Sequence, residues 1–197
     1  LPNYVAHEGT LTPPDVPVHV EDFELHIDVA ACAAPGYAPD YDIYFDWEAN
    51  DGGFVSGGEN SSWAWGVITS GPGAAHSGTK GIATNPSGTY NNNEKSWMVS
   101  PAMDLTAYGS NSAIIEFWQY IYTESATYTW DQVTVQVTKD GGTTWLPVFG
   151  PTQRQDTGWS KVTLVLDPSY NVADFQIRFY FKSDYSGVRD GWYIDDL

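Results

Sequence analysis

Hydrophobic and polar residues alternate along three stretches in the last third of the chain, at residues 131–140, 159–167 and 174–184. The apolar positions of these stretches are Val133, Val135 and Val137, then Val162, Leu164 and Leu166, then Phe175, Ile177, Phe179 and Phe181. A period of two residues is typical of an antiparallel strand that buries one face and leaves the other to water. Each stretch therefore predicts a half-buried strand.

Shorter runs rich in aromatic and β-branched residues predict further strands elsewhere in the chain. They lie at residues 41–47, 62–68, 80–85, 96–100, 113–122, 144–149 and 191–195. Gly, Pro and Asn separate these runs, as expected of tight turns, and no stretch has the period of a helix. About ten short strands predict an all-β fold, a two-sheet antiparallel β-sandwich of the jelly-roll type.

The first forty residues differ in composition from the rest of the chain. They hold six of the twelve prolines and one alternating run, at residues 18–29. We interpret residues 1–40 as an extended linker or edge segment, or as the end of an upstream domain. Residues 41–197 are then the sandwich domain. The single cysteine, Cys32, excludes an internal disulfide.

The chain is strongly acidic, with 25 Asp and Glu against 8 Lys and Arg and a formal net charge of −17. A surface of this sign repels nucleic acid and anionic membranes, and it attracts divalent cations. No apolar run reaches the ~18 residues that a membrane-spanning helix needs, so we expect no membrane insertion.

Sequence motifs typical of common catalytic sites are absent from the sequence. It has no His-Glu-x-x-His, no Gly-x-Ser-x-Gly and no phosphate-binding Walker loop. Glu116 with Glu124, or Glu124 with Asp131, has the residue types of a glycosidase acid–base pair. Because such pairs arise by chance in a chain this acidic, we assign no catalytic residue.

Aromatic residues are unusually frequent, with nine Trp and thirteen Tyr. In the predicted strand at 113–122, Trp118, Tyr120 and Tyr122 share one face, opposite a second apolar face. Exposed rings of this kind stack on sugars or hold peptide segments. The candidate ligand-binding residues are therefore Trp118, Tyr120, Tyr122 and Trp130. The alternative is that these rings belong to the core.

The stretch "TKDGGTTW", at residues 138–145, resembles the Asp box of sialidase-like propellers. Asp140 can accept amide hydrogens of the turn, Gly141 and Gly142 supply positive φ angles, and Trp145 packs across the hairpin. The box occurs once in this chain, so it predicts a hairpin and not a glycosidase.

Four segments, taken in order, resemble one family of domains. They are "FDWEANDGGF", "SSWAWGVITSGPGAAHSGTKGIATNPSGTYNNNEKSWMVSPAMDL", "VQVTKDGGTTW" and "GWYIDDL". The family is the MAM-like jelly-roll accessory domains of secreted bacterial proteins. It includes the choice-of-anchor J domains, the cleaved adhesin domains of gingipains and the domains attached to immune inhibitor A-type metallopeptidases. The resemblance covers residues 41–197 and implies a secreted, extracellular location.

The resemblance also implies a structural Ca²⁺. In such domains an opening Asp-Phe-Glu and a closing Ile-Asp-Asp are associated with calcium; this chain has Asp46-Trp47-Glu48 and Ile194-Asp195-Asp196. The implied metal ligands are Asp46, Glu48, Asp195 and Asp196. Loop oxygens from residues 76–78 or 91–93 would complete a shell of about six to eight oxygens. The alternative is that Asp195 and Asp196 are solvated carboxylates at the end of a strand.

Three functions remain open at this point. The first is a non-catalytic, calcium-stabilised accessory domain of a larger secreted hydrolase, a peptidase, whose partners are a protein substrate and other domains of the same polypeptide. The second is a carbohydrate-binding module or adhesin domain that binds glycan through exposed aromatic rings. The third is a small jelly-roll enzyme that acts on polysaccharide.

Overall fold

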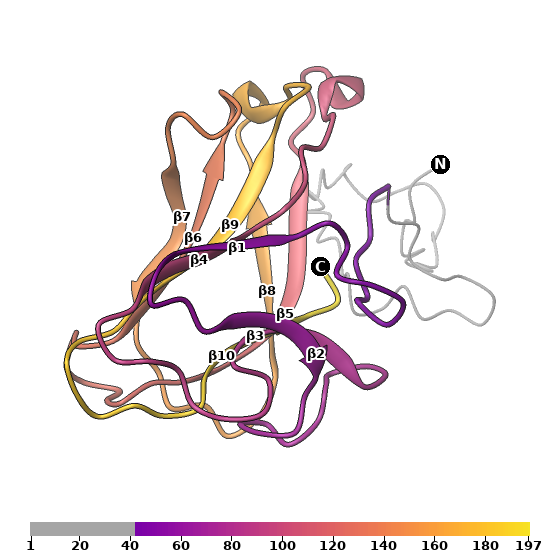
Figure 1. The fold of residues 1–197 in the computed structure, drawn as a ribbon. Coiled ribbons are helices and arrows are strands. Elements are labelled where there is room, and N and C mark those ends of the chain that lie inside the picture. Colours follow the sequence, from indigo (N-terminus) through magenta and orange to yellow (C-terminus); the bar gives the residue numbers. More distant parts are fainter. Residues whose placement is uncertain (1–41) are drawn as a thin grey trace, which may run out of the picture. The chain divides into compact units, whose positions relative to one another are not determined.

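The structure is a computed structural model that describes residues 42–197, which form two antiparallel sheets of five strands each (Figure 1). Sheet A has the order β1-β4-β9-β6-β7, with β1 at Val55–Glu59, β4 at Lys95–Val99, β9 at Gln176–Lys182, β6 at Gln132–Thr138 and β7 at Leu146–Thr152. Sheet B has the order β2-β3-β10-β5-β8, with β2 at Trp63–Val67, β3 at Lys80–Thr84, β10 at Gly191–Asp195, β5 at Ile114–Tyr122 and β8 at Ser160–Val165. Short 3₁₀ helices lie at Thr106–Tyr108 and Pro168–Tyr170. The predicted all-β, two-sheet sandwich is confirmed.

The core lies between the two sheets and is built from the alternating positions read in the sequence. Ile177, Phe179 and Phe181 of β9 are at most 1% exposed, and the three valines of β6 are fully buried. From sheet B, the rings of Phe117 and Trp192 meet Phe179 edge to face, each with its centroid 5.4 Å away. Each fully buried side chain of this size contributes about 1.5–3 kcal/mol to folding. The predicted period of two is therefore confirmed for β6 and β9.

The predicted strand at residues 41–47 is wrong over its described part, residues 42–47. The chain turns there, with Trp47 at a φ of 53°. Its ladder is limited to one pair of backbone hydrogen bonds, from Phe45 N to Leu197 O at 2.7 Å and from Leu197 N to Phe45 O at 3.1 Å. The apolar residues of this run fill the core without forming a strand, because Phe45 and Trp47 pack against each other and against Phe54.

Strand β1 was absent from the sequence-based expectation because its sequence, VSGGE, holds one apolar residue and two glycines. It pairs with β4 through the backbone, in a register that places Gly57 opposite Trp97. A Cβ atom on Gly57 would lie 2.9 Å from Nε1 of Trp97. Glycine is therefore required here, because the indole ring lies flat over the backbone of β1.

The central strands of sheet B are buried on both faces. Its inner face joins the main core, and on its outer face Ile68, Ala83, Tyr120 and Tyr193 form a second apolar cluster. The segment between β2 and β3, residues 68–79, contributes to this cover, and the hydroxyl groups of Ser70 and Tyr193 lie 2.8 Å apart. A central strand covered on both sides can be apolar on both faces, as the sequence of β5 is.

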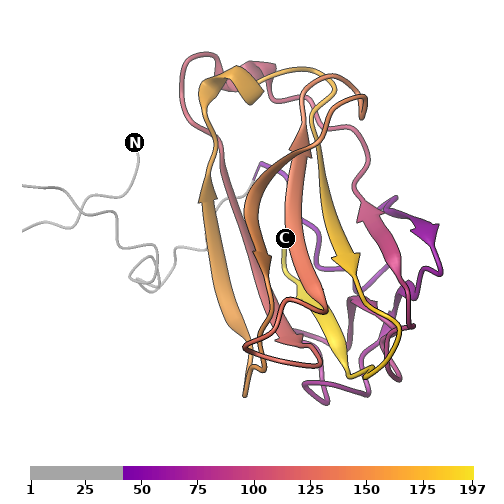
Figure 2. The same cartoon turned by 90° about the vertical axis from the view of Figure 1, so that its left-hand side faces the viewer.

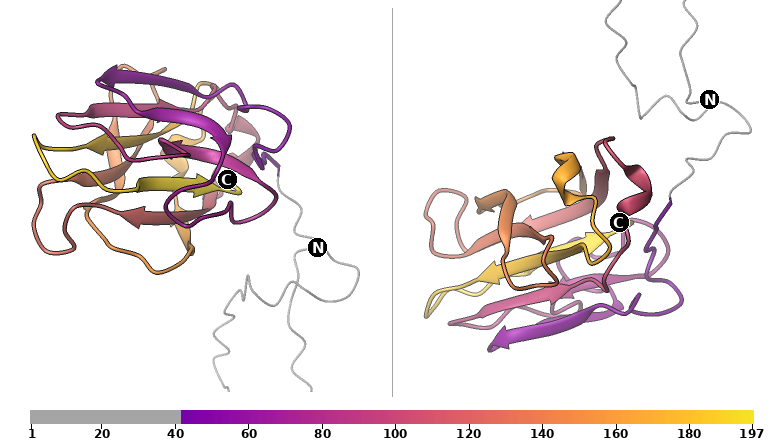
Figure 3. Two further views of the ribbon diagram at one scale, coloured as in Figure 1. Left: turned by 60° about the horizontal axis from the view of Figure 1, so that its bottom comes forward. Right: turned by 90° about the horizontal axis from the view of Figure 1, so that it is seen from above.

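Strand β10 occupies the middle of sheet B, between β3 and β5. The C-terminal end of the chain, which Figures 1 and 3 show just beyond β10, pairs with Phe45 through two backbone hydrogen bonds of Leu197. None of the described helices is long and apolar enough to cross a membrane. The predicted strand at residues 18–29, the expected linker at 1–40 and Cys32 lie outside the described residues.

Candidate functional site

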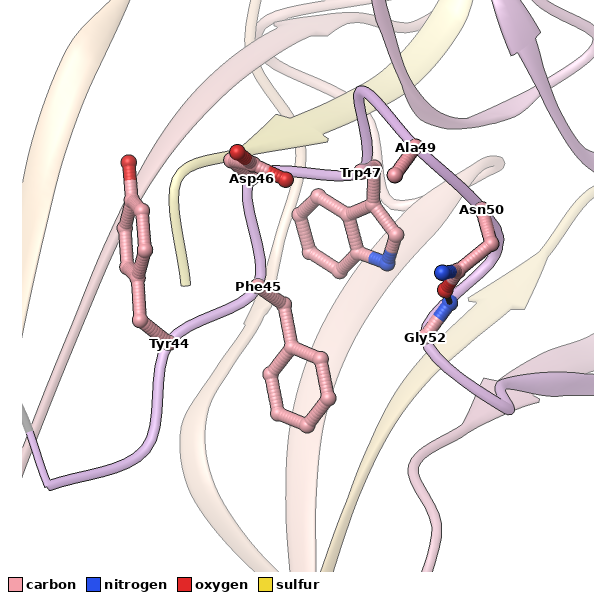
Figure 4. Close-up of a pocket in the computed structure, with 7 residues that line it drawn as sticks. All are labelled: Tyr44, Phe45, Asp46, Trp47, Ala49, Asn50 and Gly52. Atoms are coloured by element: carbon pink, nitrogen blue, oxygen red, sulfur yellow. Dashed lines mark hydrogen bonds between the residues drawn. The ribbon is translucent and has the colours of Figure 1, made fainter.

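The start and the end of the described domain meet beside a pocket lined by Tyr44, Phe45, Asp46, Trp47, Ala49, Asn50 and Gly52 (Figure 4). The hydroxyl group of Tyr44 donates to Oδ1 of Asp196 at 2.7 Å. In Figure 4 the ring of Phe45 points away from Tyr44, which lies next to the C-terminal segment. The acidic residues of the two predicted motifs are thereby brought to one end of the sandwich.

Asp195, the last residue of β10, is fully buried and accepts three backbone N–H groups. Its Oδ2 accepts from His76 N at 2.9 Å and from Ser77 N at 3.1 Å, and its Oδ1 accepts from Asp196 N at 2.9 Å. Burial, and to a lesser extent the negative charge of Asp196, raises the pKa of Asp195 to about 7. The three hydrogen bonds act in the opposite direction but do not outweigh burial.

Glu48 binds the next two residues of the same segment. Its Oε1 accepts from Lys80 N at 2.7 Å and from Thr79 N at 2.8 Å, and the Lys80 ammonium donates to the Glu48 carbonyl at 2.8 Å. These backbone hydrogen bonds lower the pKa of Glu48, and the bond from Lys80 N has the largest effect. Asp46 lies apart from them, because its Oδ1 accepts from Glu48 N at 3.1 Å within its own turn.

Asp196 completes the contacts around residues 76–80. Its Oδ1 accepts from Ser77 Oγ at 2.7 Å, and its Oδ2 lies 2.6 Å from His76 Nδ1. We call Glu48, Asp195 and Asp196 the chain-end cluster. The structure gathers these three around one segment and leaves the fourth predicted ligand, Asp46, in its turn. Where the sequence analysis expects loop oxygens, N–H groups face the carboxylates, so hydrogen bonds join the two ends of the domain.

A second group of carboxylates lies at another place in the fold. Glu124, Asp131 and Asp184, which we call the acidic triad, have ligand atoms within 4.8 Å of one another. Asp131 is 1% exposed and accepts hydrogen bonds from the Tyr90 hydroxyl and, at 2.9 Å, from Asp184 N. Oε2 of Glu124 is buried and has no hydrogen-bond partner within residues 42–197. The triad thus lacks the full set of donors that the chain-end cluster has.

From the sequence, Glu124 and Asp131 were considered only as a chance pair, and Asp184 was missed. A usable signal was present: Asp131 directly precedes β6 and Asp184 follows β9 by two residues. Because β6 and β9 are antiparallel with Gln132 opposite Lys182, residues at these strand ends become neighbours.

The triad is electrostatically unfavourable without a counter-charge. Burial and then the charges of Asp131 and Asp184 raise the pKa of Glu124, and burial raises the pKa of Asp131. Both oxygens of Asp131 are occupied, which leaves it poorly placed as a general acid or base for a large substrate. Carboxylate oxygens are the preferred ligands of hard cations, so the triad can hold a metal ion.

Of the four candidate aromatic residues, Trp130 is the most exposed. Its ring is 44% exposed and stacks on Tyr128, itself 58% exposed, with the ring centroids 4.6 Å apart and the planes 15° from parallel. Both rings lie in the segment that links β5 to β6, between two members of the triad, Glu124 and Asp131.

The other three candidates lie on the covered outer face of sheet B. Trp118 stacks on the imidazole of His76 with a centroid distance of 3.8 Å. Tyr120 is 7% exposed and meets Tyr193 edge to face, and Tyr122 stacks on Tyr120 with the centroids 6.4 Å apart. These rings mainly hold the segment between β2 and β3 against the sheet.

Sequence comparison gives one informative relative. No family model matches the chain. Bacillopeptidase F of Bacillus subtilis (strain 168) is 31% identical to it over 152 residues. The match takes in 77% of this chain and 10% of bacillopeptidase F, so this chain spans about a tenth of that protein's length.

Comparison with solved structures identifies the fold. The K2 cleaved adhesin domain of Lys-gingipain has a TM-score of 0.52 and 12% identity, with 78% of this chain and 95% of that domain covered. The C-terminal family 22 carbohydrate-binding module of Clostridium thermocellum Xyn10B covers 80% of this chain and 94% of its own, with 14% identity and a TM-score of 0.47. At these identities the likeness concerns the fold alone, and only the first score is high enough to support it. This chain has a β-sandwich fold similar to that of the K2 cleaved adhesin domain, and its sequence is similar to a segment of bacillopeptidase F.

Proposed function

We propose that this chain is a non-catalytic, calcium-stabilised accessory domain of a larger secreted bacterial hydrolase, a peptidase. The observation that carries the proposal is the match to bacillopeptidase F, which takes in most of this chain but a tenth of that protein. Residues 41–197 would be the folded domain, and residues 1–40 a linker or the end of an upstream domain. Its partners would be other domains of the same polypeptide and a protein substrate or a glycan.

We place the Ca²⁺ first at Asp46, Glu48, Asp195 and Asp196. Support comes from Asp195, whose buried carboxylate has a pKa near 7 and is held charged at neutral pH only by favourable contacts. A divalent cation would supply such a contact and would stabilise the junction of the two chain ends.

The second position for the ion is the acidic triad. Support comes from the buried, unpartnered Oε2 of Glu124 and from the raised pKa values of Glu124 and Asp131. A cation would give that oxygen a ligand bond and would offset the repulsion among the three carboxylates.

Thermal unfolding with excess Ca²⁺ and with a chelator tests the calcium proposal. A hundredfold excess over Kd stabilises the folded state by about 2.7 kcal/mol. For a domain of this size that corresponds to a rise in melting temperature of about 5–10 °C. Asp195→Asn should abolish the response if the ion lies in the chain-end cluster, and Asp184→Asn if it lies in the triad. Coincident melting curves for the unsubstituted protein would refute calcium binding at both positions.

The accessory role is tested in the full-length parent protein. Deleting residues 41–197 should leave cleavage of a short peptide unchanged and reduce cleavage of a large protein substrate, because the domain engages the substrate away from the active site. Loss of short-peptide cleavage in a protein that still folds would contradict this role. Polysaccharide turnover by the isolated domain, abolished by Glu124→Gln, would contradict it as well.

The second candidate function is a carbohydrate-binding or adhesin domain. The exposed stack of Tyr128 on Trp130 favours it, because a flat pair of rings offers sugar a large apolar contact at a small cost in side-chain entropy. A glycan array would reveal such binding, and Trp130→Ala should remove it.

A further inference from the structure

The two charge signs are distributed unevenly over this molecule. The strands of sheet A hold three basic residues, Lys95, Arg178 and Lys182, which are three of the eight in the chain. They hold one acidic residue, Glu59, although the chain has 25. That residue lies 3.8 Å from the Lys95 ammonium, so its charge is offset. Sheet A is therefore a locally basic region of a protein with a net charge of −17.

All three basic residues lie on the outer face of sheet A, because their neighbours along β4 and β9 point into the core. Met98 of β4 and Phe179 of β9 are buried, whereas Lys95, Arg178 and Lys182 alternate with the buried positions. The strand register places Lys95 directly opposite Lys182. Figure 2 shows β7, β6, β9 and β4 side by side in this sheet.

Three aromatic rings share this face with the cations. Trp97 and Tyr180 are cross-strand neighbours on β4 and β9, and the Trp97 ring lies over Gly57 of β1. The third ring, that of Trp145, comes from the turn between β6 and β7. All three are partly exposed, so the face combines flat apolar surfaces with positive charge.

Arg178 lies at the centre of the three rings. Its guanidinium carbon is 4.3 Å from the ring centroid of Trp145, 5.5 Å from that of Trp97 and 5.8 Å from that of Tyr180. Its Nε donates to Oε1 of Gln136 at 2.6 Å, which fixes the plane of the group. Among the described residues no carboxylate forms an ion pair with it. The guanidinium therefore keeps its two Nη groups for an anionic partner.

The Asp-box motif holds Trp145 in this position. Oδ1 of Asp140 accepts from Thr138 Oγ1 at 2.6 Å and from Thr144 N at 2.8 Å, directly before the tryptophan. Gly142 takes a φ of 88° and passes beside the indole, which is 3.6 Å from where a Cβ would lie. The predicted hairpin is present, and it orients Trp145 over Arg178.

We propose that the outer face of sheet A binds a polysaccharide that contains uronic acid. Arg178 would receive the sugar carboxylate in a bidentate pair, and Trp97, Trp145 and Tyr180 would stack on the rings. Lys95 and Lys182 add positive charge along the face, and the amide of Gln136 lies within reach of sugar hydroxyls. The inference goes beyond the proposed accessory role, and it depends on neither cation site and not on Trp130.

A sugar polymer fits this face better than an acidic peptide does. Strand β6 adds the partly exposed amides of Gln132 and Gln136 to this face, which suit a ligand covered with hydroxyl groups. A peptide that adds a strand to a sheet uses an open edge, here β1 or β7, whereas these rings lie across the middle strands.

The test measures binding of this domain to polygalacturonate, alginate and hyaluronan by isothermal titration, with fully methyl-esterified polygalacturonate as the uncharged match. We expect binding to at least one of the three acidic polymers and at least about tenfold weaker binding to a neutral form. Arg178→Gln and Trp97→Ala should each weaken the binding about tenfold or more. Lys161→Gln removes one charge from sheet B, and Tyr185→Ala removes an exposed ring outside the face; both should bind as the unsubstituted domain does.

Melting curves of each variant ensure that only folded protein is compared. Arg178→Lys provides a milder change, because it keeps the positive charge but loses the planar guanidinium. It should bind between the unsubstituted domain and Arg178→Gln. The proposal is overturned if none of the three acidic polymers binds. It is equally overturned if Lys161→Gln weakens binding as much as Arg178→Gln, or if polyglutamate binds as tightly as the sugars. Failure of this test leaves the calcium response and the parent-deletion test unaffected.

Discussion

The chain-end cluster and the acidic triad contain the same residue types, but the repulsion among their carboxylates is offset by hydrogen-bond donors to different extents. In the chain-end cluster, residues 76–80 supply backbone N–H groups to Asp195 and Glu48, and hydroxyl and imidazole groups to Asp196. In the triad, Asp131 accepts from the Tyr90 hydroxyl and from Asp184 N, and Oε2 of Glu124 has no hydrogen-bond partner among the described residues. The pKa of Glu48 is lowered, whereas the pKa of Glu124 is raised.

The comparison shows that donors and burial together decide how an acidic cluster behaves. Glu48 accepts two backbone N–H groups and has a lowered pKa, whereas burial outweighs three N–H groups at Asp195 and raises its pKa to about 7. A carboxylate with an unpartnered buried oxygen is stabilised only by a proton or a cation. The two clusters should therefore respond differently to the removal of charge, of donors and of calcium.

The largest effect is expected from Asp195→Ala. Removal of this fully buried carboxylate leaves the N–H groups of His76, Ser77 and Asp196 without their acceptor. Each buried donor left unpaired costs about 1–3 kcal/mol, and partial rearrangement reduces the sum, so we expect a loss on the order of 3 kcal/mol. Urea unfolding measures it. Asp46→Ala, at an exposed position whose carboxylate accepts one local hydrogen bond, is the matched control and should lose well under half as much.

A smaller loss is expected from Tyr90→Phe in the triad. The Tyr90 side chain is buried, and its hydroxyl donates to Oδ2 of Asp131. Without it Oδ2 of Asp131 loses this donor, which costs about 1–2 kcal/mol in urea unfolding. A loss as large as that of Asp195→Ala would show that the triad depends on donors as strongly as the chain-end cluster does, contrary to the comparison.

Neutralising one member of the triad should have the opposite sign. In the presence of a chelator, Glu124→Gln removes repulsion from Asp131 and Asp184, so the melting temperature should rise by about 2 °C. Glu48→Gln should lower it, because this residue binds N–H groups of Thr79 and Lys80 more weakly as an amide. If both variants shift in the same direction, the two clusters do not differ as described.

The fold was predictable from the sequence wherever one face of a strand is buried. Val133, Val135 and Val137 alternate with polar residues because one face of β6 packs in the core and the other carries polar side chains. The same rule fails for β1, because Gly57 is required there by the close approach of the Trp97 ring and not by burial. It also fails for β5, which is apolar on both faces because residues 68–79 help to cover the outer face of sheet B.

The site was predictable to a lesser extent. The motifs around Glu48 and Asp195 pointed to one end of the domain, and the structure gathers both residues around residues 76–80. The triad was missed because the two strands were predicted but not their pairing, and the register of β6 against β9 brings Asp131 to Asp184 across 53 positions. Hydrogen-bond donors from loops have no sequence pattern of their own, so the sequence could not tell which carboxylates they satisfy.

Asp140 gives the smallest effect and isolates the contribution of donors from that of neighbouring carboxylates. Hydrogen bonds from the Thr138 hydroxyl and from Thr144 N lower its pKa to about 2, as donors lower that of Glu48. An unfolded Asp has a pKa of about 3.9, so the unfolded chain binds a proton more tightly than the folded domain does. The stabilisation is therefore complete above about pH 5 and is lost as the pH falls from about 4 to 2. The melting temperature of the unsubstituted domain should exceed that of Asp140→Ala above pH 5, and the difference should shrink toward pH 2. Asp140 belongs to neither cluster, so its response reports on hydrogen-bond donors without neighbouring carboxylates. A melting-temperature difference that stayed constant from about pH 5 to pH 2 would show that these donors do not lower the pKa of Asp140.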